Sequence, residues 1–208
     1  MDSICPLCNS HHTVSYQQDS DYRQCSICQL IYTPQDQHLN ESEEKSRYDQ
    51  HQNDPQDQRY RDFLSKVFNP VLNHIKPGQQ GLDFGCGPGP TLSLMFNECG
   101  YQVDLYDKYY AADEAVFSKS YDFITTTEVA EHLEAPGYEL DRLFSMLNPG
   151  GVLALMTQLY DGVDFAQWHY KNDPTHICFY HSDTMRFLAA RWQVHVEIIQ
   201  PDVALFYR

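Results

Sequence analysis

Apolar residues recur at helical spacing from Tyr60 to Ile75, and afterwards they fall into short runs that alternate with further helical patterns. Pro70 should kink the first helix or split it in two, because proline removes a backbone donor inside a helix. The expected later strands are 81–84, 101–106, 121–126 and 152–156, and the expected helices are 91–99 and 138–147. Strands and helices in alternation are typical of a parallel sheet.

The C-terminal part of the pattern breaks this alternation. Residues 158–180 form a long segment rich in aromatic and histidine side chains, which we expect to be a loop. Ser182 is the expected N-cap of a helix that runs to Ala190. Residues 192–199 and 203–207 are then expected to form a closing antiparallel pair of strands.

The N-terminal part is more polar. Residues 35–58 are rich in Gln, Asp, Glu and Asn, and Leu39 is almost their only large aliphatic residue. We therefore expect a small unit at 1–34, a polar linker at 35–58 and a larger domain at 59–208. The acidic cluster of the linker is most simply a solvated face, formed by Glu41, Glu43 and Glu44.

Charge narrows the range of partners. The 208 residues include 14 Lys and Arg against 29 Asp and Glu, which gives a net charge of -15. Nucleic acids and anionic membranes are bound by clustered basic residues, so both are disfavoured. No apolar run approaches the length of a membrane span, and the N-terminus lacks the pattern of a secretory signal, so the expected location is cytoplasmic.

Four of the cysteines form two CxxC pairs near the N-terminus: Cys5 with Cys8, and Cys25 with Cys28. Two such turns place four thiolates around Zn(II), which favours tetrahedral sulfur ligands. A segment this short buries too little apolar surface to fold alone, so we interpret 1–34 as a ribbon held by structural zinc. A redox dithiol is the alternative, and the neighbouring His11 and His12 are candidates to replace one ligand.

The segment LDFGCGPGP leads from Asp83 into Gly85, Gly87 and Gly89 just before a helix begins. Glycine lets the backbone turn sharply and approach a ligand closely. A phosphate-binding loop is excluded because no Gly-Lys-Ser/Thr follows, and a dinucleotide is disfavoured because a carboxylate before the first glycine repels pyrophosphate. That carboxylate suits the cationic cofactor S-adenosylmethionine, and Asp107, at the end of the second strand, suits its ribose.

In this segment and in three later ones, the chain resembles the class I S-adenosylmethionine-dependent methyltransferases. The later matches are residues 101–107, the segment YDFITTTEVAEHLEAP and the segment LNPGGVLALMT. With its CxxC pairs and a DPTH segment, the chain is similar to a poorly characterised subgroup. Over about residues 60–208 the resemblance implies an α/β, Rossmann-like sheet, and it implies eight cofactor-binding residues: Asp83, Gly85, Cys86, Gly87, Gly89, Asp107, Thr127 and Glu128.

The chain departs from the family at one point. Only 13 residues, 108–120, separate Asp107 from the next strand, where the family usually has a helix, a third strand and a loop. We therefore expect a shortened third unit. The adenine would then be covered by one of three aromatic residues: Tyr109, Tyr110 or Phe117.

The acceptor should lie near the loop after the fifth strand, because ligands of such sheets bind beyond the carboxyl ends of the parallel strands. Our candidate catalytic residues are His176, in this loop, and His132, which the resemblance places beside the methionyl end of the cofactor. Further residues expected around an aromatic acceptor pocket are Trp168, His169, Tyr170, Asp173, Tyr180 and His181. A second metal site is conceivable, although its spacing fits no standard pattern, from His169, His176, His181 and Asp173.

These observations favour a methyltransferase with a zinc-ribbon appendage that acts on a small-molecule or protein acceptor. One alternative is a catalytically inactive adaptor that binds the cofactor, and another is an RNA methyltransferase. Arg23 is the only lysine or arginine in 1–34, which counts against RNA. A third alternative is a nicotinamide-dependent oxidoreductase, for which the binding of NAD would be the test.

Overall fold

The computed structural model describes residues 4–50, 53–199 and 201–208. Residues 1–3 of the expected N-terminal unit and 51–52 of the expected linker lie outside the described residues. The helices are α1 (Glu41–Tyr48), α2 (Gln58–His74), α3 (Thr91–Glu98), α4 (Pro136–Ser145) and α5 (Ser182–Trp192). The strands are β1 (Thr13–Ser15), β2 (Arg23–Cys25), β3 (Ile31–Tyr32), β4 (Gln80–Phe84), β5 (Gln102–Tyr106), β6 (Tyr121–Thr127), β7 (Leu147–Met156), β8 (Cys178–Phe179), β9 (His195–Ile199) and β10 (Val203–Tyr207).

The larger sheet has six strands in the order β5-β4-β6-β7-β10-β9. The strands β5, β4, β6 and β7 are parallel, whereas β10 is antiparallel to both β7 and β9. This order confirms the expected Rossmann-like sheet with its closing antiparallel pair. The shortened third unit is also confirmed, because β5 is the edge strand and a single 3-10 turn, Glu114–Ser118, lies between it and β6.

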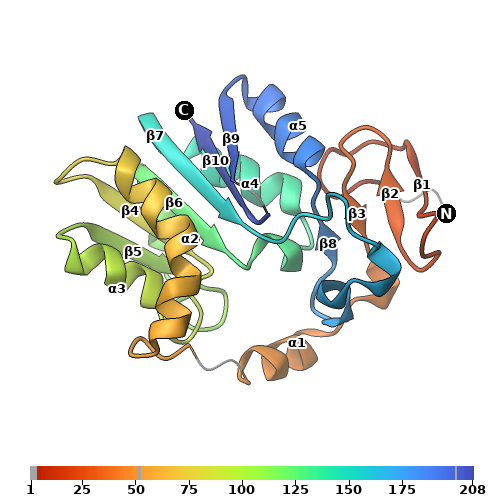
Figure 1. Cartoon of the computed structure of the whole chain (residues 1–208), viewed down its shortest axis with the longest axis horizontal. Helices are drawn as coiled ribbons and strands as arrows, with labels where there is room; N and C mark the ends of the chain where they lie inside the picture. Colours follow the sequence, from red (N-terminus) through yellow and green to blue (C-terminus); the bar gives the residue numbers. More distant parts are fainter. Residues whose placement is uncertain (1–3, 51–52, 200) are drawn as a thin grey trace.

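Helices cover both faces of this sheet (Figure 1). Alternate residues of β7 point to opposite faces, as a strand buried on both sides requires. Val152, Ala154 and Met156 pack in the layer of α2 and α3, whereas Leu153 and Leu155 pack in the layer of α4 and α5. All five are fully buried, so β7 lies at the centre of the core.

Helix α2 continues through Pro70 without division. Of the two expected outcomes, a kink or a split, the split is therefore wrong. Proline removes only its own backbone donor, while the burial of Val67 and Val71 on either side favours a continuous helix.

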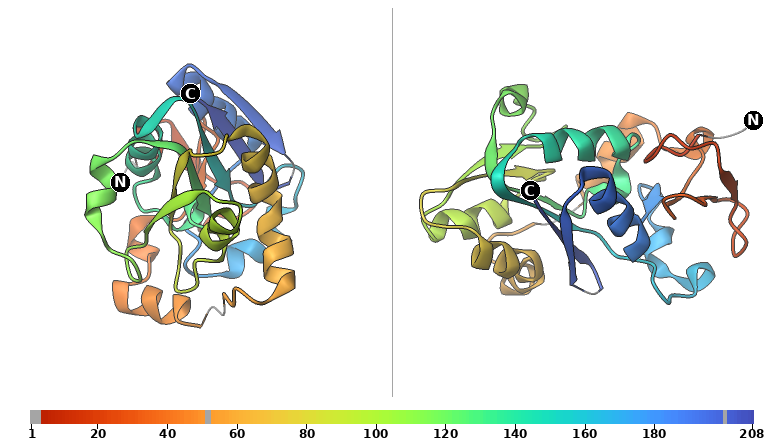
Figure 2. Two further views of the ribbon diagram at one scale, coloured as in Figure 1. Left: turned by 90° about the vertical axis from the view of Figure 1, so that its left-hand side faces the viewer. Right: turned by 90° about the horizontal axis from the view of Figure 1, so that it is seen from above.

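The N-terminal unit forms a second sheet, of four strands in the order β1-β2-β3-β8. Three of these strands lie within residues 13–32, but β8 belongs to the segment that follows β7. Ile31 pairs with Phe179, and Tyr32 pairs with Cys178. The N-terminal unit therefore lies beside β8 at one end of the molecule (Figure 1), away from α2 and α3 (Figure 2).

Residues expected as a polar linker include the helix α1. The side chain of Asn40 accepts hydrogen bonds from the amides of Ser42 and Glu43, and the Glu43 carboxylate accepts one from the amide of Asn40. This reciprocal capping starts the helix although none of its residues is buried. The segment is thus more ordered than its composition indicates.

Helix α5 begins one residue away from the expected cap. Its N-cap is His181, whose Nδ1 accepts a hydrogen bond from the amide of Asp183, and not Ser182. Ser182 instead donates its hydroxyl to Asp161, at 2.5 Å. Within the described ranges, no helix is both long and apolar enough to cross a membrane.

Candidate active site

A cavity of about 550 Å³ lies at the carboxyl ends of three parallel strands, where it is lined by Phe84, Tyr106 and Thr127. Its position and size suit a cofactor-sized ligand. All eight residues expected to bind the cofactor line this cavity: Asp83, Gly85, Cys86, Gly87, Gly89, Asp107, Thr127 and Glu128. The candidate catalytic residues His132 and His176 line it as well.

The glycine loop after β4 is fastened to the end of β5 by one carboxylate. Gly85 and Gly87 have φ values of +79° and +63°, which L side chains rarely adopt. Oδ2 of Asp107 accepts a bond from the Gly87 amide at 2.9 Å, and Oδ1 accepts bonds from the amides of Tyr109 and Tyr110 at 2.8 and 3.1 Å. Because a carboxylate has about four acceptor positions, Asp107 keeps about one for a ligand.

Replacing Gly85 with alanine should destabilise the protein by ~3 kcal/mol or more. The added Cβ would lie 2.2 Å from Cγ2 of Val129, and the positive φ adds backbone strain. The matched control is Gly100→Ala, where φ is +86° but nothing lies within 4 Å of the added Cβ, so ~1–2 kcal/mol of strain is expected. Urea unfolding measures both losses, and equal values would contradict the close packing at Gly85.

The cavity is acidic. Asp83 is 4% exposed and accepts a hydrogen bond from the Thr125 hydroxyl at 3.0 Å. Burial raises the pKa of Asp83 to about 6, and the charge of Asp107 adds to the rise. The described lining residues include a single lysine, Lys108, against six carboxylates, Glu44, Asp83, Asp107, Glu128, Glu134 and Glu139. Such a wall favours a cationic ligand over a pyrophosphate.

Two polar residues line the cavity at and just after the end of β6, namely Thr127 and Glu128. Oγ1 of Thr127 is buried and has no hydrogen-bond partner among the described residues. Glu128 follows with a φ of +53°, a left-handed conformation that is uncommon for residues other than glycine. Burial raises the pKa of Glu128 to about 9, and the charge of Glu131 adds to this rise. A ligand that donates hydrogen bonds and carries positive charge fits both groups.

Helix α1 forms part of the cavity wall through Glu44 and Tyr48. The Glu44 carboxylate accepts bonds from the hydroxyls of Tyr109 at 2.5 Å and Tyr48 at 2.9 Å, and it lies 3.4 Å from Nζ of Lys108. Our interpretation of Glu44 as part of a solvated face is therefore wrong, because these partners hold it inward. The capping sequence that starts at Asn40 is the signal that would have revealed this helix.

The two candidate catalytic histidines lie together, with ring centroids 4.8 Å apart. Nδ1 of His132 donates to the carbonyl of Thr175 at 2.9 Å, and Nδ1 of His176 donates to the carbonyl of Tyr170 at 2.6 Å. Asp173 fixes the turn before His176 by accepting bonds from the amide and hydroxyl of Thr175. Burial lowers the pKa of His176 and so favours its neutral imidazole.

The aromatic residues expected around an acceptor do not line the cavity. Trp168 and Tyr170 are buried in a cluster with Ile31 and Phe179, between the N-terminal unit and the segment after β7. Tyr180 is also buried and donates to the carbonyl of Ala130 at 2.9 Å. The expected aromatic pocket is wrong because these side chains cover the strand pair β3–β8.

The second metal site that the loop residues made conceivable is not formed among the described residues. His169 is exposed. Nε2 of His181 lies 3.2 Å from Asp161 and its Nδ1 caps α5, so neither ring lies with His176. His181 is separated from His176 by β8, so proximity in sequence does not bring these residues together.

Two of the three aromatic residues proposed to cover an adenine line the cavity, namely Tyr109 and Tyr110. Phe117 is not among the lining residues. Its ring packs edge-on against Tyr106, with centroids 4.5 Å apart, and it lies under the guanidinium of Arg142.

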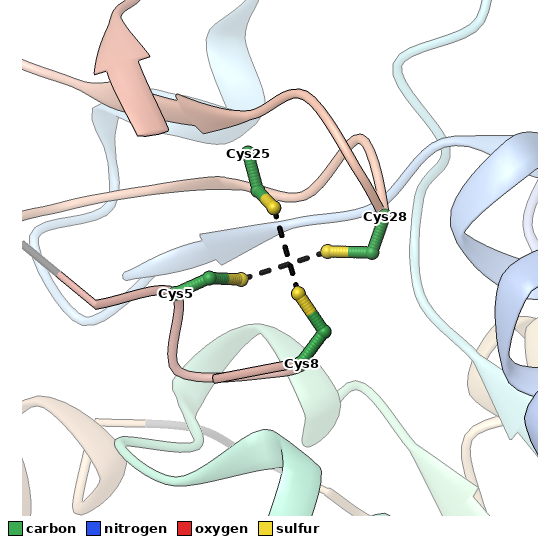
Figure 3. A group of neighbouring side chains, drawn as sticks. All are labelled: Cys5, Cys8, Cys25 and Cys28. Atoms are coloured by element: carbon green, nitrogen blue, oxygen red, sulfur yellow. Dashed lines mark hydrogen bonds between the residues drawn. The ribbon is translucent and has the colours of Figure 1, made fainter. Parts of the chain in front are cut away.

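Four cysteine side chains converge in the N-terminal unit (Figure 3): Cys5, Cys8, Cys25 and Cys28. The Sγ atoms of Cys5 and Cys28 lie 3.5 Å apart, as do those of Cys8 and Cys25. Tetrahedral Zn–S bonds of ~2.3 Å separate sulfur atoms by ~3.8 Å, so the group fits a zinc ion and not disulfide bonds. The nearby His11 and His12 are exposed and outside this group.

A family model described as a methyltransferase domain matches residues 48–193, well over half of the chain. The chain therefore belongs to the methyltransferase domain family. It is a methyltransferase, and the family match specifies no acceptor. A sequence search of curated proteins finds no significant match.

Solved methyltransferases share the fold of this methyltransferase. The 1,6-didemethyltoxoflavin-N1-methyltransferase of Burkholderia thailandensis, solved with 1,6-didemethyltoxoflavin and S-adenosylhomocysteine, has a TM-score of 0.54 and 16% identity, over 86% of this chain and 94% of that one. The magnesium protoporphyrin IX methyltransferase of Synechocystis PCC 6803, solved with S-adenosylhomocysteine, has a TM-score of 0.50 and 15% identity, over 80% and 94% of the two chains. At these identities the likeness establishes the fold alone.

Proposed function

We propose that the methyltransferase binds S-adenosylmethionine in the acidic cavity and transfers its methyl group to a small-molecule or protein acceptor. The observation that carries this proposal is the meeting of the glycine loop, Asp107 and an acidic wall in one cavity. Asp107 offers its remaining acceptor position to a ribose hydroxyl. Asp83 and Glu128 face the positively charged methionyl part, and the Thr127 hydroxyl gains a partner.

The backbone of the loop is the floor of the proposed cofactor site, formed by Gly85, Cys86, Gly87 and Gly89. Gly89 permits the closest approach of another segment, since an added Cβ would lie 2.1 Å from the carbonyl of Asn53. The cofactor supplies an activated methyl group on its sulfonium. The chain supplies alignment of the acceptor with that methyl group.

His132 and His176 are our candidate catalytic residues at the acceptor end. Both line the cavity, and because each Nδ1 donates to a carbonyl, the lone pair of each ring is on Nε2. The acidic cavity and the net charge of -15 favour a small-molecule or protein acceptor over RNA.

We also propose that the four cysteines hold one structural zinc ion and that 1–34 is a zinc ribbon. The sulfur separations of 3.5 Å support this assignment. Reduced thiols of this kind persist in the cytoplasm, where we place the protein.

Calorimetric titration of the zinc-loaded protein with S-adenosylmethionine and S-adenosylhomocysteine tests the cofactor assignment, with NAD as the control. We expect micromolar binding of the first two and none of NAD. Binding of NAD alone would overturn the proposal. Cofactor binding without methyl transfer across an acceptor screen would support the inactive adaptor instead.

The affinity for S-adenosylhomocysteine should increase ~10-fold between pH 5 and pH 7, because a group with a pKa near 6 goes from mostly neutral to mostly ionised over this range. Burial raises the pKa of Asp83 to about 6, and its ionised form attracts the ligand ammonium. The contribution of Asp83 to the stability of the ligand-free protein should fall as the pH rises from ~4 to ~6, since folding disfavours its ionised form. Titration calorimetry across this range measures the affinity. Asp83→Asn should remove the pH dependence, and a flat wild-type profile would contradict the assignment.

A further inference from the structure

Glu131 lies beside the two histidines, deeper than the cavity wall, and its side chain is fully buried. One carboxylate oxygen of Glu131 and one ring nitrogen of each of His132 and His176 all lie within 4.8 Å of one another. Oε1 of Glu131 accepts a hydrogen bond from the Tyr170 hydroxyl. Oε2 has no hydrogen-bond partner in the part of the chain that the structure describes.

We propose that Glu131, His132 and His176 bind a divalent transition-metal ion of the Zn(II) or Fe(II) class. Two imidazoles and one carboxylate are a donor set that these ions favour, and three protein ligands leave coordination positions open. This ion is additional to the zinc held by the four cysteines.

The surroundings of the two imidazoles support this assignment. Metal-binding histidines usually donate their second ring nitrogen to a carbonyl or carboxylate, which orients the ring. Both rings do so here, towards the carbonyls of Thr175 and Tyr170. The amide of Ile177 donates to the carbonyl of Glu131 at 2.8 Å and thereby joins the segment of His176 to that of His132. Tetrahedral ligation at ~2.1 Å needs donor separations of ~3.4 Å, so the set closes with side-chain movements of about 1 Å.

Charge balance gives an independent reason for a cation. Burial disfavours the ionised form of both Glu128 and Glu131, and the charge of Glu131 adds to this effect at Glu128. Within the described residues, no lysine or arginine forms an ion pair with either carboxylate. Buried carboxylates are costly unless a partner compensates them, and a divalent ion beside Glu131 provides that compensation.

The open positions of the ion face the acceptor. His132 and His176 line the cavity, whereas Glu131 is fully buried and does not line it. The open coordination positions of the ion would therefore face the cavity, on the side away from the Glu131 carboxylate. This step rests on the proposed methyl transfer. The acceptor would then carry an oxygen or nitrogen lone pair that ligates the ion beside the atom to be methylated. The two histidines would act through the ion and not as the base itself.

Cobalt(II) reconstitution of the metal-free full-length chain tests the site without any need for activity. We expect two cobalt ions per chain. One would show the intense thiolate charge-transfer absorption of a sulfur site, and the other the weaker absorption of a nitrogen and oxygen site. Glu131→Gln and His176→Asn should each weaken the second ion by at least ~100-fold and leave the first unchanged. The matched control is His169→Ala, on the same segment but exposed, which should retain both ions.

Circular dichroism and S-adenosylhomocysteine binding show whether each variant is folded. A single, sulfur-bound cobalt ion in the wild-type protein would overturn the proposed site, and so would a second ion that persists in both variants. If the wild-type protein held two cobalt ions but did not bind S-adenosylhomocysteine, that result would instead count against the proposed function. The two failures are therefore distinguishable.

Discussion

Replacing Asp107 with alanine should weaken the binding of S-adenosylhomocysteine by ~100-fold or more. The carboxylate holds the Gly87 amide on one side and the amides of Tyr109 and Tyr110 on the other. Each hydrogen bond to a charged group contributes ~1.5–3 kcal/mol, and ~1.4 kcal/mol corresponds to a tenfold change in affinity. The variant loses both the shape of the glycine loop and the ribose acceptor. Titration calorimetry measures the change.

Asp104→Ala is the matched control, because Asp104 lies in β5, just before Asp107, but pairs with Lys119 and the Tyr121 hydroxyl outside the cavity. Its affinity should equal that of the wild type. If Asp107→Ala still bound the ligand tightly, the cofactor site would have to lie elsewhere.

Replacing Cys28 with serine should release one zinc ion and lower the melting temperature by ~10 °C or more. Structural zinc contributes ~10–16 kcal/mol to isolated zinc fingers, and a chain of this length loses ~2–4 °C per kcal/mol. The damage should reach the acceptor end, because β8, which pairs with β3, begins two residues after His176. Acceptor turnover should fall while cofactor binding persists. Calorimetry and metal analysis of the purified variant measure these changes.

Cys99→Ser provides the comparison, since Cys99 is exposed and outside the group of four cysteines. It should keep its zinc and its melting temperature. An unchanged melting temperature in Cys28→Ser would mean that the N-terminal unit folds without metal.

The cofactor side of the cavity could be predicted from the sequence because its determinants are local. Asp83 and the glycines lie in one short segment, and each apolar run around them is long enough to specify a buried strand. The position of Asp107 then follows from strand order, since the carboxyl ends of neighbouring parallel strands meet at one edge. Which ligand each residue binds stays a prediction.

Helix α1 could not be predicted from apolar periodicity, since none of its residues is buried. It is held by polar contacts between elements far apart in the sequence. Glu44 bonds to Tyr109, and Arg47 pairs with Asp173 at 3.3 Å. Such pairs leave no pattern along the chain.

The prediction of which residues surround the acceptor was wrong for a different reason. The cluster of Glu131, His132 and His176 joins the ends of two segments that are distant in sequence, whereas we grouped His176 with its neighbours in the same loop. Those neighbours, among them Trp168, pack against the N-terminal unit. The many aromatic residues of this loop therefore form an interface with the N-terminal unit and not a pocket for the acceptor.

The pairing of β3 with β8 imposes an order on how the protein is completed during synthesis. The cysteine turns are finished once residue 28 has been made, but Ile31 finds its partner only when Phe179 has left the ribosome. At ~5–20 residues per second, the free edge of β3 waits roughly 7–30 s. During that interval an unpaired strand edge with two apolar side chains is open to chaperones and to other nascent chains.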